Sequence, residues 1–207
     1  MQTSDGHELR NQTTPGDVIQ KVPCTRWTEL QGSLEYHIQL AGLLEATTIF
    51  RFLNDPGRSA GPQEFSVGDC TATTTIEEQM EAALAVVRKA SPRGVTPLTA
   101  HLQDIKGQIM TMEADLRERG QEAVVVLATD GLPSNAYGES TEAVLREFLY
   151  ALKEIQSLPV WVVIRLCTDD EKVVSYYNSL DSEVCVHVCL PACVRVCVCL
   201  YGVFGLI

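Results

Sequence analysis

The sequence is short of positive charge and lacks the motifs of several common enzyme classes. Among its 207 residues, 16 Lys and Arg stand against 27 Asp and Glu, which gives a net charge of −11. An acidic chain repels phosphate backbones, so this composition disfavours nucleic acid as a partner. The patterns G-x-x-x-x-G-K-[ST], G-x-S-x-G and G-x-G-x-x-G do not occur. The sequence therefore offers no phosphate-binding loop, nucleophile elbow or dinucleotide fingerprint of the usual kind.

The first 14 residues contain no apolar stretch, so we do not expect them to be a secretory signal peptide. Three cysteines (Cys24, Cys70 and Cys167) are scattered through residues 1–183, and the other five fall in the last 24 residues. An even number spread through a short secreted chain would predict a disulfide framework, but this distribution does not. We therefore expect a cytoplasmic protein.

Composition divides the chain into three parts. Residues 1–25 are polar and contain several Gly and Pro, so we expect a loop. Residues 26–183 have the patterning of a globular domain. Residues 184–207 form a Val- and Cys-rich apolar tail in which Arg195 is the only formal charge. An acidic domain thus precedes a nearly uncharged segment.

Hydrophobic periodicity within residues 26–183 predicts alternating helices and strands. The predicted helices cover about 26–44, 76–90, 98–119, 141–156 and 169–181, and the predicted strands cover 46–54, 64–67, 123–129 and 159–167. Capping boxes are predicted at Thr75–Glu78 and Thr168–Glu171. The apolar side of the second helix is predicted to consist of Ile76, Met80, Leu84 and Val87. This alternation indicates an α/β fold around a parallel sheet, whose ligands bind beyond the carboxyl ends of the strands.

Two residues with oxygen-bearing side chains are predicted at that edge of the sheet. Asp130 directly follows the strand 123–129, and Thr96 lies in a loop between two helices. A carboxylate and a hydroxyl that converge there suit Mg²⁺, which prefers oxygen ligands and usually keeps several waters. Each residue also has a purely structural interpretation, because Asp before Gly is common in turns and Thr before Pro is common in loops.

Four segments resemble a von Willebrand factor type A (VWFA) domain of the intracellular type. LATDGLPS (127–134) and GVTPL (94–98) resemble two of its metal-site loops, and RWTEL (26–30) and FRFLN (50–54) resemble its first helix and second strand. The resemblance implies a doubly wound, Rossmann-like and mostly parallel sheet with helices on both faces.

The same resemblance implies a non-enzymatic protein-interaction module. Its metal-ion-dependent adhesion site (MIDAS) combines a D-x-S-x-S motif, a Thr and an Asp, and Thr96 and Asp130 match the second and third elements. In a complete domain, Mg²⁺ would bridge this site to an acidic residue of a protein partner.

The chain departs from the family at its beginning, because no D-x-S-x-S occurs and no strand is predicted before the helix 26–44. We interpret Met1 as the internal Met that often follows this motif, so that the first central strand is missing and the domain 26–183 is incomplete. The strands 46–54 and 123–129 would then lose a shared partner, and their backbone groups would go unpaired or would pair in a register that the family does not have. Thr96 and Asp130 alone are too few ligands to hold Mg²⁺ tightly, so we expect weak binding or none.

The tail 184–207 has three interpretations. Its length and apolar character suit a membrane anchor, although Arg195 and Pro191 oppose a spanning helix. Its cysteines could form a metal or redox cluster, although none of them forms a C-x-x-C pair. Alternating Val and Cys is also what a GT dinucleotide repeat encodes, so the segment is most simply explained as read-through. The same alternation would physically allow residues 184–190 to occupy the position of the family's sixth strand.

Two other functions stay open. A strand followed by Asp-Gly could be half of a phosphoryl-transfer site in another α/β fold, and the tail could make this a tail-anchored membrane protein. The four histidines lie in unrelated contexts, and His37 and His101 are interpreted as ordinary helix residues rather than catalytic bases.

Overall fold

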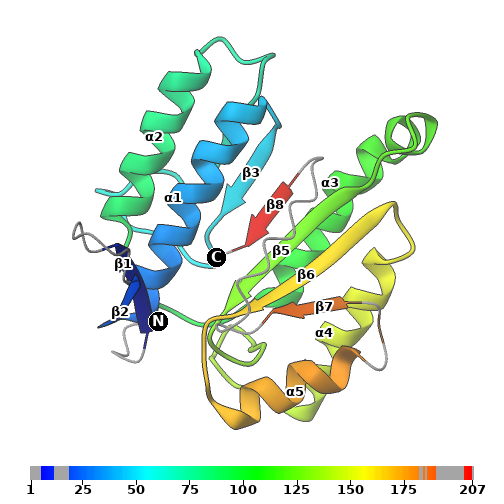
Figure 1. The fold of residues 1–207 in the computed structure, drawn as a ribbon. Helices are drawn as coiled ribbons and strands as arrows, with labels where there is room; N and C mark the ends of the chain where they lie inside the picture. The colour runs from blue at the N-terminus through cyan, green and yellow to red at the C-terminus, as the bar shows by residue number, and fades with distance from the viewer. Residues whose placement is uncertain (1–5, 12–18, 182–183, 185, 190–202, 207) are drawn as a thin grey trace.

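In the computed structural model, residues 6–11, 19–181, 184, 186–189 and 203–206 are described, and they form a mixed α/β fold (Figure 1). The helices of this part of the chain are α1 (Arg26–Leu44), α2 (Ile76–Lys89), α3 (Leu98–Glu118), α4 (Glu142–Ile155) and α5 (Glu171–Asp181). The strands are β1 (Gly6–Asn11), β2 (Ile19–Cys24), β3 (Thr48–Arg51), β4 (Glu64–Val67), β5 (Ala123–Thr129), β6 (Val160–Leu166), β7 (Val186–Cys189) and β8 (Val203–Leu206). The α/β class predicted from the sequence is confirmed.

The main sheet has six strands in the order β4-β3-β8-β5-β6-β7. Its edge strand β4 is antiparallel to β3, whereas the pairs β3–β8, β8–β5, β5–β6 and β6–β7 are parallel. The longest ladder joins β5 to β6 from Ala123↔Val160 to Thr129↔Leu166. The side chains of β5 are buried along almost its whole length, as its continuous apolar sequence predicts.

The central position expected to lack a strand is filled by a segment from the tail, because no strand that precedes α1 belongs to the main sheet in the described part of the chain. β8, from the end of the apolar tail, lies between β3 and β5, so Val203 is opposite both Thr48 and Val124. The facing edges of β3 and β5 carry backbone groups that need hydrogen-bond partners, and the tail supplies them. Of the two outcomes expected for the strands 46–54 and 123–129, unpaired facing edges are therefore ruled out, whereas pairing that departs from the family pattern is what the structure has.

Two apolar cores lie on opposite faces of the sheet. One core is formed by α3, α4 and α5 with β5 and β6, and includes Leu127 and Leu166. The other is formed by α1 and α2 with β3, and includes Ala128 and Cys167. Because successive strand residues point to opposite faces, Leu127 and Ala128 belong to different cores. Helices therefore cover both sides of the sheet (Figure 1).

The helix starts follow local capping chemistry in most cases. Thr25 Oγ1 accepts a hydrogen bond from Thr28 N at the start of α1, and the predicted capping box of Thr75 and Glu78 is confirmed at the start of α2. The box predicted at Thr168–Glu171 is wrong. α5 is capped instead by Asp170, whose Oδ1 accepts from the backbone N–H groups of Lys172 (2.9 Å) and Val173 (3.3 Å). A carboxylate two residues closer to the helix competes better for these donors.

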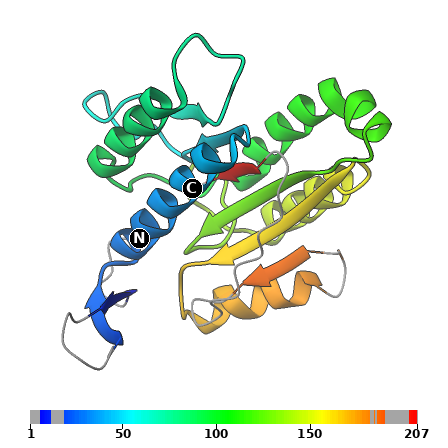
Figure 2. The same ribbon diagram turned by 45° about the horizontal axis from the view of Figure 1, so that its top comes forward.

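Two further expectations are corrected. Residues 1–25 are not all loop, because β1 and β2 form an antiparallel hairpin at the N-terminal end of α1, apart from the main sheet (Figure 2). The buried side of α2 is wider than predicted: Val87 is buried and Met80 and Leu84 pack against the core as expected, and Gln79, Ala83 and Val86 are buried as well. Gln79 is buried because its side chain accepts a hydrogen bond from Asp69 N and donates to the carbonyls of Asp69 and Thr74. This polar anchoring could not be foreseen from an apolar pattern.

The tail contributes two strands to the sheet. β7 pairs in parallel with β6, with Val186 opposite Val162, so part of the segment 184–190 forms the strand that its alternation would allow. Residues 190–202 lie outside the described residues, and with them lie Arg195, Pro191 and most cysteines of the proposed metal or redox cluster. Within the described residues, no helix has the length and apolar character needed to cross a membrane.

Candidate functional site

A cavity of about 320 Å³ lies at the carboxyl ends of β3 and β5. Its walls come from residues 52–56 after β3, residues 90–96 between α2 and α3, the end of β5 and Trp27 of α1. Thr96 and Asp130, which the sequence places at the same edge of the sheet, both line this cavity. The fold therefore brings the two predicted site residues to one place.

Thr96 is fixed by a reciprocal pair of hydrogen bonds to the loop after β5. Its backbone N–H donates to Ser134 Oγ (2.8 Å), and its carbonyl accepts from Ser134 N (2.9 Å). Ser134 is buried, so these bonds are shielded from water. The Thr96 hydroxyl lies close to Gly131, where an added Cβ would be 3.5 Å from Oγ1. Ser134 was not singled out from the sequence, although it belongs to the segment LATDGLPS.

Asp130 is held by the residues on either side of it. Thr129 Oγ1 accepts from Gly131 N (3.2 Å) and donates to Gly131 O (3.1 Å). Tyr177 of α5 also donates its hydroxyl to Gly131 O (3.1 Å). Tyr177 is fully buried, and this burial raises its pKa well above the ordinary value, so it stays a neutral donor. The turn that presents Asp130 is thus anchored to α5.

The wall formed by residues 52–56 is fixed by Asn54, which follows β3. Its Nδ2 donates to Val95 O (2.7 Å) and connects the loop after β3 to the loop of Thr96. Gly94 makes this close approach possible, because its φ is +95° and an added Cβ would lie 2.6 Å from Asn54 Cγ. The sequence marked Asn54 only as the end of a strand, since nothing local predicts a partner 41 residues away.

The site also contains a positive charge that sequence reasoning missed. Arg26 Nη1 lies 4.0 Å from Asp130 Oδ2, and both side chains are largely buried, at 15% and 23% exposed. Arg26 is the first residue of α1 and belongs to the segment RWTEL. Arg93 and Asp55 also line the cavity. The cavity therefore carries charges of both signs.

These residues do not fit a tightly bound divalent cation. Mg²⁺ requires about six oxygen ligands. The two predicted ligands are the Asp130 carboxylate, already close to a guanidinium, and the Thr96 hydroxyl, while the other carboxylate of the lining, Asp55, accepts a hydrogen bond from Gly57 N (2.7 Å). Within the part of the chain that the structure describes, no three His, Cys, Asp or Glu side chains are grouped to hold a metal ion. The expectation of weak or absent Mg²⁺ binding stays a prediction for solution measurements.

Each of the two helical histidines, His37 and His101, donates a hydrogen bond from a ring nitrogen to a backbone carbonyl oxygen. His37 Nδ1 donates to Ser33 O (2.6 Å), and His101 Nε2 donates to Leu53 O (2.9 Å). Burial lowers the pKa of His37. Neither ring is among the residues that line the cavity.

Comparisons of this chain with protein-family models, with curated proteins and with solved structures give no match.

Proposed function

We propose that this chain is a non-enzymatic protein-interaction module of the VWFA type, built on a doubly wound sheet and acting in the cytoplasm. The observation that carries the proposal is that Thr96 and Asp130 line one cavity at the carboxyl ends of β3 and β5. Folds that change strand order at such a position bind their ligands there. The free thiols Cys70 and Cys167 are compatible with a reducing compartment.

The cavity has the composition of a protein-binding site. Its floor includes the half-buried Trp27 and the buried Phe52, whose ring centroids lie 6.3 Å apart. Asp55 and the exposed Arg93 add charges of both signs. Aromatic anchors surrounded by charged and polar groups are typical of interaction hot spots. In a complete domain of this family, Mg²⁺ would bridge the site to its protein partner. Because this chain keeps only Thr96 and Asp130 of the family's metal ligands, we propose that its side chains contact the partner directly.

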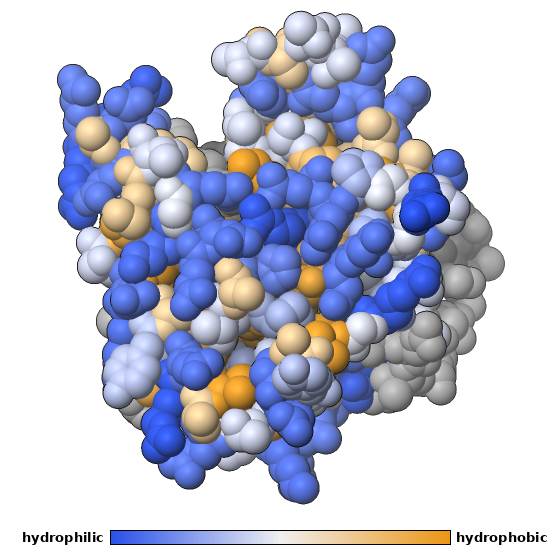
Figure 3. Space-filling view, turned by 180° about the vertical axis from the view of Figure 1, so that it is seen from behind, coloured by the Kyte–Doolittle hydropathy of each residue, from blue (hydrophilic) through white to orange (hydrophobic). Residues whose placement is uncertain are grey.

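The face of the molecule that lies behind the view of Figure 1 is less suited to specific binding. Figure 3 shows that this face is mostly hydrophilic and that its apolar residues are scattered in small separate patches. Scattered apolar residues are normal for a solvent-exposed surface and need no partner. We therefore place the interaction at the cavity.

The experiment compares capture of cell proteins by the immobilised full chain and by site variants. Asp130→Ala and Trp27→Ala should reduce the retained partner by about tenfold, as expected when a hot-spot contact is removed. Glu147→Ala is the matched control, because Glu147 is an exposed acidic residue of α4, outside the residues that line the cavity. Circular dichroism verifies the fold of each variant.

Two results would contradict this proposal. Equal retention by the wild type and by both site variants would remove the cavity as the binding site. Hydrolysis of a generic phosphate ester by the full chain, lost in Asp130→Asn, would instead favour the phosphoryl-transfer alternative.

A further inference from the structure

The two halves of the main sheet are joined by one short strand. β3 pairs with β4 on one side and with β8 on the other, and β5 pairs with β6 and with β8. β3 and β5 are therefore not paired with each other, and both depend on β8 for the hydrogen bonds of their facing edges. We call this position between β3 and β5 the strand slot.

β8 is a weak occupant of the strand slot. It pairs with Val124–Leu127 and leaves the first residue and the last two residues of the seven-residue β5 outside its ladder. Gly205 is the third of its four residues, and glycine within a strand lowers its stability. Central strands are usually longer, with about five or six residues. A strand of this kind is open to replacement.

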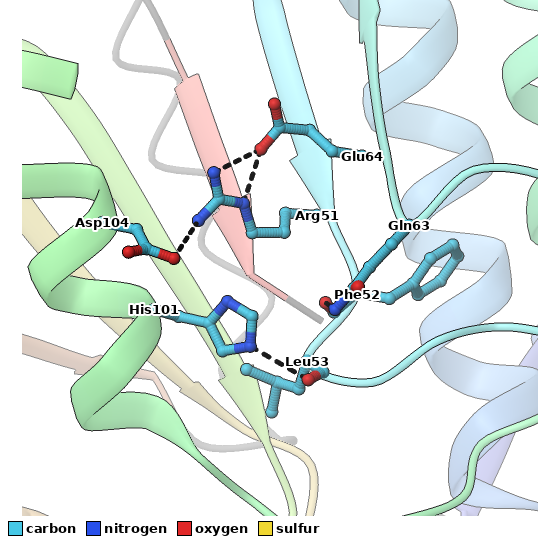
Figure 4. A network of polar contacts seen from close by, with 7 residues as sticks. All are labelled: Arg51, Phe52, Leu53, Gln63, Glu64, His101 and Asp104. Carbon is cyan, nitrogen blue, oxygen red and sulfur yellow. Dashed lines mark hydrogen bonds and ion pairs between the residues drawn. The ribbon is translucent and has the colours of Figure 1, made fainter.

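The strand slot is held in place by contacts that do not involve β8. Figure 4 shows a polar network from the end of β3 to α3, in which Arg51 pairs with Asp104 (3.5 Å) and His101 Nε2 donates to Leu53 O (2.9 Å). Asn54 adds a hydrogen bond to Val95 O. Ile49 and Leu53 also pack against the core formed by α3, α4 and α5. These contacts join β3 to α3, to the loop before it and to the core independently of β8.

We propose that the strand slot is an exchangeable strand-binding site and that it accepts β8 of a second copy of this chain. The second copy presents the same backbone and side chains, so it reproduces the pairing of Val203 with Thr48 and Val124 without any new complementarity. The stretch 190–202 separates β8 from β7, and a chain of that length spans at most roughly 40 Å. That reach exceeds the roughly 15 Å across three strand spacings, so the strand can extend to a neighbour. Exchange of an identical element between protomers is a known route to dimers.

The magnitude of the effect follows from competition between the two strands. The chain's own β8 competes at an effective concentration on the order of millimolar. Refolding of the full chain from urea at about 1 mM should therefore give a substantial fraction of dimer. Refolding at a hundredfold lower concentration should give mostly monomer. Size-exclusion chromatography with light scattering measures both fractions.

Phe204→Pro tests whether β8 makes the dimer. Proline lacks the backbone N–H and is excluded from central strands. The dimer fraction of this variant should therefore be at least about tenfold lower than that of the wild type. Ala136→Pro is the matched control, because Ala136 is exposed at the second position of a turn closed by Gly138 N and Asn135 O, where proline is favoured. A dimer that persists unchanged in Phe204→Pro overturns the proposal.

A peptide keeps the test decisive if Phe204→Pro fails to fold. The probe contains residues 201–207 with solubilising lysines and a photoreactive benzoylphenylalanine at the position of Phe204. With the wild-type chain it should cross-link to β3 or β5 and reduce the dimer fraction, whereas a scrambled peptide should do neither. Cross-links elsewhere overturn the proposal, and so does a wild-type chain that stays monomeric after refolding at about 1 mM.

Discussion

Arg26 Nη1 lies 4.0 Å from Asp130 Oδ2, so the first residue of α1 places a positive charge beside the carboxylate that ends β5. A metal ion at Asp130 would have to share this carboxylate with a partly buried guanidinium. Arginine remains charged at all physiological pH values. The candidate site therefore already contains a cation of its own.

Magnesium titration tests this interpretation directly. We expect calorimetry to detect no Mg²⁺ binding at micromolar concentrations, because Asp130 and Thr96 provide only two of the about six oxygen ligands needed and Arg26 repels the ion. The same titration with Asp130→Ala provides the baseline. Micromolar binding by the wild type that disappears in Asp130→Ala would show that the site holds the metal after all.

Gly94 is predicted to be essential for the geometry of the site loops. Its φ of +95° is unfavourable for other residues, and a Cβ would meet Asn54 at 2.6 Å. Gly94→Ala should lower the free energy of unfolding by about 1–3 kcal/mol in urea denaturation. Gly107→Ala is the control, since Gly107 lies in α3 with no atom within 4 Å of its added Cβ. That variant should gain about 0.5–1 kcal/mol, and similar losses in both variants would refute the explanation.

His37 should make stability depend on pH in the acidic range. Burial lowers its pKa below the ordinary 6.5, the hydrogen bond to Ser33 O opposes this shift, and the charge of Arg165 adds to it. Above about pH 6.5 both the folded and unfolded states hold neutral His37, so its contribution to stability is fully present. Below that pH the unfolded chain takes up the proton first, and stability is lost as pH falls through the lowered folded-state pKa.

His37→Gln removes this titration and keeps a side chain that can donate to Ser33 O. Urea unfolding between about pH 7 and about pH 5 should therefore show a smaller loss of stability in the variant than in the wild type. Parallel pH curves for the two proteins would show that His37 does not contribute.

Two of the thiols, Cys70 and Cys167, should differ in reactivity. Cys70 is exposed, whereas Cys167 is buried and this burial raises its pKa to about 11. Thiolate is the reactive form, so iodoacetamide at about pH 8 should label Cys70 in the folded protein and Cys167 only after denaturation. Peptide mass spectrometry separates the two sites. Equal labelling of both in the folded chain would indicate that the core around Cys167 opens readily.

Local sequence patterns were sufficient for most of the individual elements. The strands AVVVLAT and EFSV occupy the predicted residues, and the capping box of Thr75 and Glu78 forms as expected. These features depend on side-chain periodicity and on hydrogen bonds between residues close in sequence. The positions of Thr96 and Asp130 at one edge of the sheet also followed, because each lies in a loop whose direction is fixed by the element before it.

Contacts between distant segments required the tertiary structure. The pairing of Arg26 with Asp130 and the burial of Gln79 against Asp69 leave no mark in periodicity. The largest difference is β8, whose Val203 lies opposite Thr48 although about three quarters of the chain separates them in sequence. A short apolar segment can pair with any open strand edge, so its sequence defines only that it can form a strand. Which strand edge it fills is decided by the unpaired backbone groups that the rest of the fold leaves between β3 and β5.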